Sequence, residues 1–528
     1  MAKDRDHKER GGGGHGDKKM CVGVIWNCAA ELKLLLGALF ILCSVVTVLQ
    51  FLPSRFTISP TDLRLCLSKI STATTTTATA ISNDYNDGSS SYFSILPSPS
   101  PSPPYTAAPP PPPAVEHEQI LNNSILKRAF NPYGAAAYNF ITMGAYRGGP
   151  NTFAVVGLSS KPLHVFGKPV YECEWVPKNN PENFTFAAQT YKILPDWGYG
   201  RVYTVVVVNC TFSVPINVDN TGGSLFLHAS TSGGGDTKFN LTDRILSLEE
   251  KPDSVDFSIF SASSKPKYDY LYCGSSLYGS LSPQRMREWI AYHVRLFGEK
   301  SHFVIHDAGG VHEEVLEVLK PWMELGYVTL QDIRDQERFD GYYHNQFLVV
   351  NDCLHRYKHM AKWMFFFDVD EFIYVPSKQN IKSVIDSQSD FTQFTIEQNP
   401  MSGQLCAQDD YGKAHRRWGF EKLVYKDVKR GIRRDRKYAI QPRNVFATGV
   451  HMSMNLQGRS NHKTMMRYFH YHGTIAKRTE PCRNYVNWTR DNFENKPYVL
   501  DTTLRNTALA VKKFEYSMIG SRLQNTRQ

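Results

Sequence analysis

The chain has 528 residues, of which 41% are hydrophobic and 21% are charged. At roughly 150 residues per domain this length predicts about three domains, and it excludes a minimal binding module. The 60 basic and 50 acidic residues give a formal charge of +10. This excess favours anionic partners such as nucleotide diphosphates and does not demand nucleic acid. The ten cysteines form no C-x-x-C pair, which argues against a cysteine-held metal.

The N-terminal part of the chain has the pattern of a membrane anchor. Residues 1–33 are charged and glycine-rich without an apolar period, which predicts a disordered cytosolic tail. Residues 34–52 form a run of 19 residues without a charge, enough for one helix across a hydrocarbon core of about 30 Å. The run lacks the features of a cleaved signal peptide. Seven Lys and Arg residues precede it, so we predict a single-pass type II membrane protein.

Residues 53–116 are dominated by Ser, Thr and Pro, a composition that predicts an extended stem. The following sequence fits a lumen, because five glycosylation sequons occur at Asn122, Asn183, Asn209, Asn240 and Asn487. Seven cysteines lie beyond the apolar run and allow three disulfides with one spare. We expect Cys173 to pair with Cys210, because both lie in strand-like segments of one small region.

Residues 117–264 are predicted to be β-rich. Six β-like runs between turn signals cover residues 151–158, 170–176, 184–194, 201–212, 224–229 and 255–262, and they predict a β-sandwich. Trp175, Trp197, Tyr199 and Tyr203 are candidates for a sugar-binding platform, since a flat ring can cover the C–H face of a pyranose. The alternative is that they are the core and rim aromatics of an ordinary sandwich.

From residue 265 to residue 528 the periodicity changes. Predicted strands at 269–273, 302–306, 327–330 and 363–367 alternate with predicted helices at 283–296, 311–319 and 345–359. This alternation predicts βαβ units, a mainly parallel sheet and an α/β domain. Ligands of such sheets bind beyond the carboxyl ends of the strands, where we therefore expect the chemistry.

Three acidic residues, Asp368, Asp370 and Glu371, follow an apolar run in the segment WMFFFDVDEFIYVP at 363–376. Like charges at one place cost self-repulsion and desolvation, and a hard divalent ion with substrate phosphates offsets that cost. We therefore predict a metal–diphosphate site, with solvated turn acids as the alternative. The D-x-D pattern alone is weak, because Asp4 and Asp6 in the tail also match it.

The blocks EWIAYH, HFVIHD, NDCLHR, KW and DVDEFI, in this order between residues 288 and 373, resemble glycosyltransferase family 92. The stem and the β-rich region resemble those of the plant galactan synthases in that family. The resemblance implies a Rossmann-like GT-A fold, an inverting Golgi enzyme, UDP-galactose as donor and β-1,4-galactan of pectin (rhamnogalacturonan I) as product. It also implies that residues 117–264 are a carbohydrate-binding module.

The resemblance further implies roles for individual residues. Asp370 would be a metal ligand, Asp368 would contact the metal and the donor ribose, and His470 would complete the coordination. His472 competes with His470, and His451 is the next candidate. Imidazole ligands suit manganese better than magnesium, so we expect Mn²⁺, with Mg²⁺ as the alternative.

The departing diphosphate needs a basic group as well as the ion. The segment 421–443 carries nine Lys and Arg residues and three acids. Lys437 in KYAIQP resembles a recurrent lysine of the family and is our candidate for the diphosphate. The other bases form a solvated face or a surface that attracts an acidic polysaccharide.

An inverting enzyme needs a carboxylate that takes the proton of the acceptor hydroxyl. The candidates are Glu397, Asp409, Asp410 and Glu421, among which Glu421 ranks slightly ahead of Asp410 because it matches a recurring Glu of the family. Asp409 and Asp410 form a pair that could raise the pKa of one member. Asp307, at the end of a predicted strand, is a candidate uridine contact or a helix cap.

The sequence thus predicts a membrane-anchored, metal-dependent galactosyltransferase. One alternative is a luminal glycan-binding protein without turnover. Another is a transferase for a different UDP-sugar and glycan, because pocket contacts decide the sugar. A nucleic-acid partner is not expected, and a homodimer is a candidate assembly that the sequence does not decide.

Overall fold

The computed structural model describes residues 118–526 except for 122–123, 129–130, 133–137, 162–167, 200–201, 231–241, 336–338, 340, 342–343, 377 and 432–434. All described residues belong to one compact unit, Pro60–Gln528. The predicted tail, anchor and stem, residues 1–116, lie outside the described residues. Within the described part of the chain, no helix is long and apolar enough to cross a membrane.

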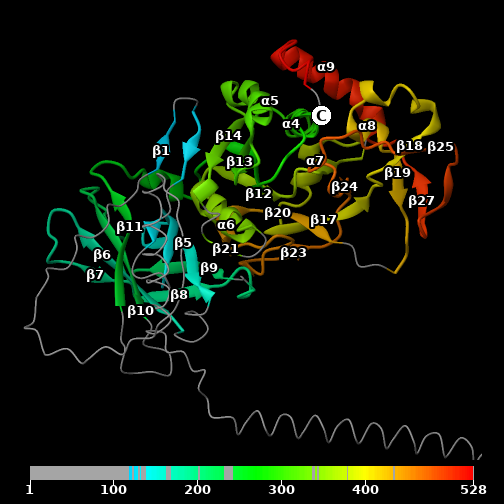
Figure 1. Ribbon diagram of the computed structural model, residues 1–528. Coiled ribbons are helices and arrows are strands. Elements are labelled where there is room, and N and C mark those ends of the chain that lie inside the picture. The colour runs from blue at the N-terminus through cyan, green and yellow to red at the C-terminus, as the bar shows by residue number, and fades with distance from the viewer. Residues whose placement is uncertain are drawn as a thin grey trace, which may run out of the picture. The chain divides into compact units, whose positions relative to one another are not determined.

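A mixed sheet forms the centre of the C-terminal region (Figure 1). Its parallel half has the order β14-β13-β12-β15 and confirms the predicted βαβ units. The bounds are β12 Tyr268–Leu277, β13 Ser301–Asp307, β14 Val328–Asp332 and β15 Ala361–Phe366. The other half, β20-β17-β24-β16, contains antiparallel pairs that we did not predict. Its bounds are β16 Glu371–Tyr374, β17 Gln393–Pro400, β20 Arg436–Ile440 and β24 Arg467–His470.

Helices pack against both faces of this sheet, as the alternation of side chains in β12 shows. Tyr270 and Tyr272 join a core with helices α4 (Pro283–Phe297), α5 (Glu313–Glu324) and α9 (Ala508–Ile519). Leu271 and Cys273 join a second core with α6 (Gln346–Tyr357). Successive residues of a strand point to opposite faces, so β12 is buried on both sides, as is typical of a parallel strand.

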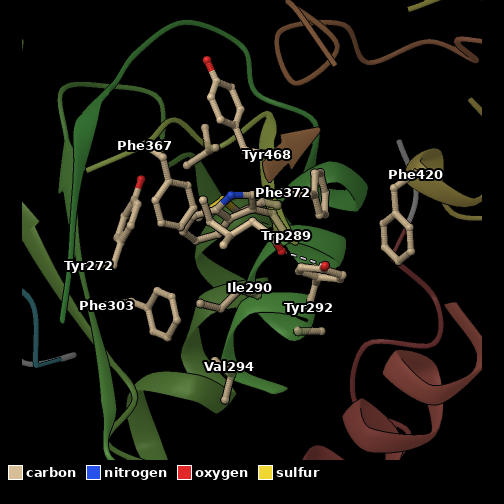
Figure 2. Packing of buried hydrophobic residues seen from close by; sticks show 14 of the residues in the cluster. Tyr272, Trp289, Ile290, Tyr292, Val294, Phe303, Phe367, Phe372, Phe420 and Tyr468 are labelled. Carbon is tan, nitrogen blue, oxygen red and sulfur yellow. Dashed lines mark hydrogen bonds between the residues drawn. The ribbon is translucent and has the colours of Figure 1, made fainter. Parts of the chain in front are cut away.

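Helix α4 fixes the position of β16, the strand that follows the acidic cluster (Figure 2). The Trp289 indole donates to the Glu371 carbonyl at 3.0 Å, and the Tyr292 hydroxyl donates to the Ile373 carbonyl at 2.8 Å. The buried His293 Nε2 accepts from the Ile373 amide at 3.2 Å. These bonds satisfy buried polar groups, and they join the main chain of β16 to a helix deep in the core.

The β-rich region forms two sheets around one core, as the sequence predicts. Cys173 in β6 is bonded to Cys210 in β9, which joins the two sheets and confirms the expected pair. The five-stranded sheet contains β3 (Asn131–Pro132), β4 (Ile141–Arg147), β5 (Thr152–Ser160), β8 (Gln189–Ile193) and β9 (Tyr203–Thr211). The four-stranded sheet contains β6 (Val170–Pro177), β7 (Thr185–Phe186), β10 (Gly223–Ser230) and β11 (Thr242–Glu250). The strand predicted at 255–262 is wrong, because this segment holds the 3₁₀ helix η1 (Phe257–Phe260).

Two further disulfides, Cys273–Cys353 and Cys406–Cys482, complete the three bridges that the cysteine count allows, and Cys66 lies outside the described residues. The β-rich region does not begin at residue 117 as expected, because the first described strands belong to the mixed sheet. The hairpin of β1 (Gln119–Ile120) and β2 (Leu126–Lys127) extends the mixed sheet, because β2 pairs with β14. The β-rich region also shares the α6 core with the mixed sheet.

A buried ionic network ties these parts together around Arg128. Its guanidinium Nη2 lies 2.8 Å from Asp352 Oδ1 in α6 and donates to the Met143 carbonyl of β4 at 3.1 Å. The Tyr146 hydroxyl also donates to Asp352. Burial by itself would raise the pKa of Asp352, but the charge of Arg128 and these bonds outweigh it and lower the pKa to about 2. The carboxylate therefore stabilises the folded state.

We expect Asp352→Asn to lower the free energy of unfolding by about 3–5 kcal/mol at neutral pH, because Arg128 loses the buried one of its two carboxylate partners and keeps only the partly exposed Glu118. In the wild-type protein this contribution is present above the unfolded pKa of about 4 and is lost as the pH falls towards about 2. Urea unfolding between these pH values measures both effects. Asp386→Asn, which changes an exposed pair with Lys382, serves as a control and should cost under about 1 kcal/mol. Equal losses in the two variants would contradict the role of the network.

Candidate active site

The acidic cluster lies at the carboxyl end of β15, which ends at Phe366. It forms a tight turn, in which the Asp368 amide donates to Glu371 Oε2 at 2.7 Å and the Glu371 amide donates to the Asp368 carbonyl at 3.2 Å. The turn lines a cavity of about 490 Å³. This is the edge of the sheet at which the sequence predicts the chemistry.

Asp370, His470 and His472 come together at this cavity, and one ligand atom from each lies within 4.8 Å of the others. The pairing of β16 with β24 places Glu371 opposite His470 and so brings the two segments together. The Gly473 amide donates to Asp370 Oδ2 at 2.9 Å and holds the carboxylate against the turn that carries both histidines. His472 thus joins His470 instead of competing with it.

His470 is oriented by a residue that the sequence analysis missed. Gln398 Nε2 lies 2.5 Å from His470 Nδ1, and His470 Nε2 lies 3.6 Å from Asp370 Oδ1. Burial by itself lowers the pKa of His470, but Asp370 and the charge of Glu371 raise it above its ordinary value. No sequence motif marks Gln398.

Asp368 is bound on its other side by Lys437 and Gln346. Lys437 Nζ lies 2.8 Å from Asp368 Oδ2 and 3.6 Å from Glu371 Oε2, and Gln346 Nε2 donates to Asp368 Oδ1 at 3.1 Å. Burial by itself would lower the pKa of the Lys437 ammonium, but the two carboxylates raise it well above its usual value. Lys437 is therefore a fixed cation beside the D-x-D pair. Gln346 was not predicted, because only the packing of α6 brings it here.

Glu371 is buried beneath the cavity. Burial, opposed by the charge of Lys437, raises the pKa of its carboxyl to about 7. The sequence analysis placed Glu371 in the acidic cluster without a role of its own. In the structure its side chain closes the turn of the D-x-D pair and faces Lys437, so it supports the geometry of Asp368.

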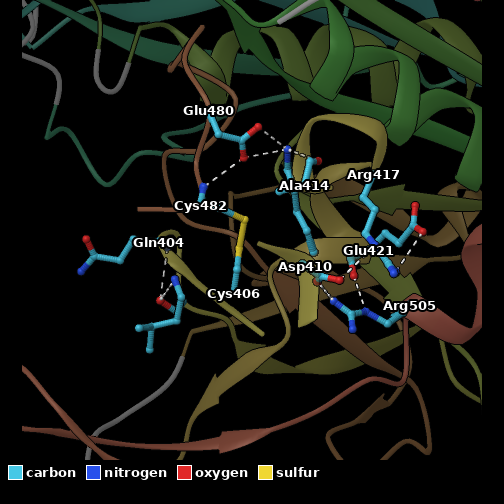
Figure 3. The surroundings of a disulfide bond; sticks show 12 residues. Gln404, Cys406, Asp410, Ala414, Arg417, Glu421, Glu480, Cys482 and Arg505 are labelled. Atoms are coloured by element: carbon cyan, nitrogen blue, oxygen red, sulfur yellow. Dashed lines mark hydrogen bonds and ion pairs between the residues drawn. A yellow bond between two sulfur atoms is a disulfide. The ribbon is translucent and has the colours of Figure 1, made fainter. Parts of the chain in front are cut away.

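The predicted catalytic bases Asp410 and Glu421 do not line this cavity, and their role as bases stays a prediction. Asp410 is fully buried and pairs with Arg417 at 3.0 Å and with Arg505 (Figure 3). Glu421 pairs with Arg417 at 3.5 Å and with Lys512, and it accepts from the Trp418 amide. Both carboxylates are thus held by cations of neighbouring segments.

Two further candidates also lie outside the cavity lining. Asp409 belongs to the 3₁₀ helix η3 (Gln408–Asp410) and is exposed. Glu397 in β17 pairs with Arg467 at 3.2 Å and with Arg436 at 3.6 Å. Among the described residues, the carboxylates that line the cavity besides the D-x-D pair are Glu371 and Asp435. His451 lines it too.

Asp307 ends β13 and caps the following turn, since its Oδ1 accepts from the amides of Gly309 at 2.9 Å and Val311 at 3.0 Å. Burial raises the pKa of this carboxyl above its ordinary value. Asp307 does not line the cavity, although its partner in the β12–β13 register, Leu277, does. Asp307 is not the predicted helix cap, because the N-cap of α5 is His312. Its carboxylate holds the turn after β13 instead, and the uridine contact stays a prediction.

Trp175 is not part of a sugar platform, because its side chain is only 3% exposed and stacks on Phe153 in the core between the two sheets. Tyr203 is buried as well. Trp197 and Tyr199 are 59% and 64% exposed, so both rings are accessible and remain predicted glycan contacts. Trp197 has a φ of 52°, which is rare for a bulky residue.

Comparisons with known proteins agree with the resemblance. The model of "Glycosyltransferase family 92" matches residues 268–508. Galactan beta-1,4-galactosyltransferase GALS3 of Arabidopsis thaliana is 58% identical over 518 residues, which cover 97% of this chain and 98% of that protein. GALS2 of the same plant is 58% identical over 100% of both chains.

More distant proteins are also similar. Beta-1,4-galactosyltransferase galt-1 of Caenorhabditis elegans is 27% identical over 39% of this chain and 49% of its own length. The solved galactosyltransferase LgtC, in complex with donor and acceptor sugar analogues, is 11% identical over 33% of this chain and 58% of its own, with a TM-score of 0.18. That score is too low to support an argument. The identity to the plant proteins over nearly the whole chain shows that the chain belongs to glycosyltransferase family 92.

Proposed function

We propose that the chain is a GT-A, metal-dependent, inverting β-1,4-galactosyltransferase that moves galactose from UDP-galactose onto the galactan side chains of pectin (rhamnogalacturonan I). Support comes from the names of the plant relatives and from one observation in the structure. Asp370, His470 and His472 meet beside Asp368 and Lys437 in a single cavity at the carboxyl end of a central strand.

The residues fit a divalent ion. One carboxylate and two imidazoles form a mixed oxygen and nitrogen donor set, which suits manganese better than magnesium. A bound ion supplies a Lewis acid for the departing diphosphate. Asp370, His470 and His472 would hold this ion, and Asp368 would contact the ribose.

The protein's own side chains supply the remaining steps. Lys437 is buried and permanently charged, so it offers a preorganised cation for the charge that develops on the leaving diphosphate. The acceptor hydroxyl must lose a proton to a carboxylate on the opposite face of the sugar. Asp435 is the exposed carboxylate outside the D-x-D pair that lines the cavity, and we propose it as the base.

A panel of UDP-sugars offered with galactan oligomers tests the proposal. We expect UDP-galactose to lengthen the oligomers by single hexoses, chelation to stop transfer, and manganese to restore it. Mass spectrometry of the products measures the outcome. Preference for another UDP-sugar would support a different transferase, and binding of galactan without consumption of any donor would support a non-catalytic glycan-binding protein.

We also propose a Golgi membrane location with the enzyme in the lumen, a β-sandwich that binds glycan, and a homodimer. The exposed rings of Trp197 and Tyr199 support the glycan proposal. We expect Trp197→Ala to raise the KM for long galactan by about fivefold or more, because one stacking contact is lost, and to leave the KM for short acceptors unchanged. Phe186→Ala, at another exposed ring of the sandwich, is the control. Equal effects on long and short acceptors would contradict the platform.

A further inference from the structure

A second cavity, of about 890 Å³, lies between α4, α9 and the segment 415–418. Five Lys and Arg residues line it, namely Arg287, Arg416, Arg417, Lys512 and Lys513. Glu480 and Glu515 are the acids of the lining, so the formal excess among the described lining residues is +3 with His415 neutral. We call this cavity the basic cavity. It has no part in the donor site described above.

Some of these cations are fixed in place by buried acids. Arg287 forms a bidentate pair with Glu515 at 2.7 and 2.6 Å, and Arg417 lies 3.0 Å from Asp410 (Figure 3). Glu421, which was predicted as the base, also pairs with Arg417. Asp410 and Glu421 thus hold a cation at the wall of the basic cavity. Because these side chains are already ordered, the binding of an anion would cost less side-chain conformational entropy.

Arg416 and Lys513 have a different environment. Both are exposed, and neither forms an ion pair with another described residue. The other three cations of the lining are paired with Glu515, Asp410 and Glu421. Arg416 and Lys513 therefore carry the unbalanced charge of the basic cavity, and like charges at one place repel each other. An anionic ligand would offset that repulsion, so the charge of the basic cavity fits an anion.

An aromatic side chain restricts the class of anion. The exposed Tyr516 lines the basic cavity, whereas the ring of Trp418 is only 6% exposed and packs in the core. An aromatic ring covers the C–H face of a pyranose, and the fork of Arg416, which is unpaired among the described residues, matches a carboxylate. Both features together fit a sugar that carries a carboxylate, which is a uronate.

The basic cavity adjoins the donor cavity along the chain. Ala476 lines the donor cavity and Glu480 lines the basic one, so at most about 14 Å of extended chain separates them. The two cavities are also close at a second place. Leu281 lines the donor cavity, and Gln284, in the first turn of α4, lines the basic cavity. These short separations place the two linings within the length of a few sugar units of each other.

We propose that the basic cavity binds a uronate-containing stretch of the acceptor glycan and so positions its growing end at the donor site. This inference rests on the proposed transfer to a glycan acceptor. The site is distinct from the β-sandwich surface, and it acts through binding rather than through chemistry.

The test compares direct binding of oligogalacturonate, neutral galactan oligomers of equal length, and UDP with manganese to the full chain. We expect oligogalacturonate to bind, with an affinity that falls as salt is raised. The double variant Arg416→Glu/Lys513→Glu should weaken this binding by about tenfold or more, because two attractive charges become repulsive. UDP binding should stay within about twofold of the wild-type value in the same variant, since neither residue lines the donor cavity.

Arg295→Glu is the matched control, because it reverses an exposed charge near the opposite end of α4. Equal weakening in the control and the double variant would overturn the proposal, as would equal affinity for neutral galactan. Capture of anionic vesicles without binding of oligogalacturonate would assign the basic cavity to a lipid surface and also overturn it. Binding is measured without turnover, so an inactive enzyme that still binds oligogalacturonate would refute only the proposed transfer.

Discussion

Replacing Asp370 with asparagine is expected to lower kcat for galactosyl transfer by at least about a hundredfold. The substitution removes the negative charge of the one carboxylate among the three proposed metal ligands of the described residues, Asp370, His470 and His472. The amide keeps an oxygen that accepts from the Gly473 amide, so the turn and the fold should survive. Transfer assays with galactan oligomers measure the loss, and calorimetry with manganese should show weaker binding.

Glu397→Gln is the matched control for this variant. Glu397 lies in the same sheet but outside the cavity lining, and its partners Arg436 and Arg467 are partly exposed. We expect its kcat to stay within about threefold of the wild-type value, since surface pairs contribute little. An Asp370→Asn enzyme with wild-type kcat and unchanged manganese affinity would remove the basis of the metal assignment.

Lys437→Met is expected to affect both stability and catalysis. It leaves Asp368 and Glu371 without their shared cation, which should cost about 3–5 kcal/mol of unfolding free energy when no metal is present. Manganese should raise the melting temperature more in this variant than in the wild type, because the ion then provides the missing positive charge. Transfer should still fall by at least about a hundredfold, since the diphosphate loses a fixed cation.

The control for this experiment is Lys422→Met. Lys422 is also a fully buried lysine with an acidic partner, Glu480 at 2.8 Å, but it lies outside the donor cavity. Its loss should lower the melting temperature by an amount that does not depend on manganese. If manganese raises the melting temperature of both variants equally, the ion binds elsewhere. It then does not replace the charge of Lys437 at the D-x-D pair.

The sequence predicted those parts of the fold that carry a long, regular pattern. Helix α4 has a serine cap at Ser282, Pro283 at its start and Gly298 after its end, and all three signals are visible without a structure. The antiparallel half of the sheet consists of short strands such as β16, whose four residues give no readable period. Strands of this kind form because tertiary contacts stabilise them.

The candidate metal ligands could be named from the sequence because Asp368 and Asp370 follow a strand end and because the family resemblance points to His470. For the base the sequence left several candidates, because nothing in it separates a reactive carboxylate from one held in an ion pair. One partner of Asp410, Arg505, lies 95 residues further along the chain. For Trp175 the sequence held a usable signal, since it shares a strand face with Cys173 two residues earlier, and a bridge between sheets points inward.

The hairpin β1–β2 covers the edge strand β14, and Arg128 directly after it pairs with Asp352. This arrangement restricts where a protease could separate the folded region from the proposed membrane anchor. A cut upstream of Glu118 would leave the hairpin and its pairing with β14 intact. A cut after Arg128 would strip the hairpin from the sheet, expose unpaired backbone groups along β14 and favour aggregation.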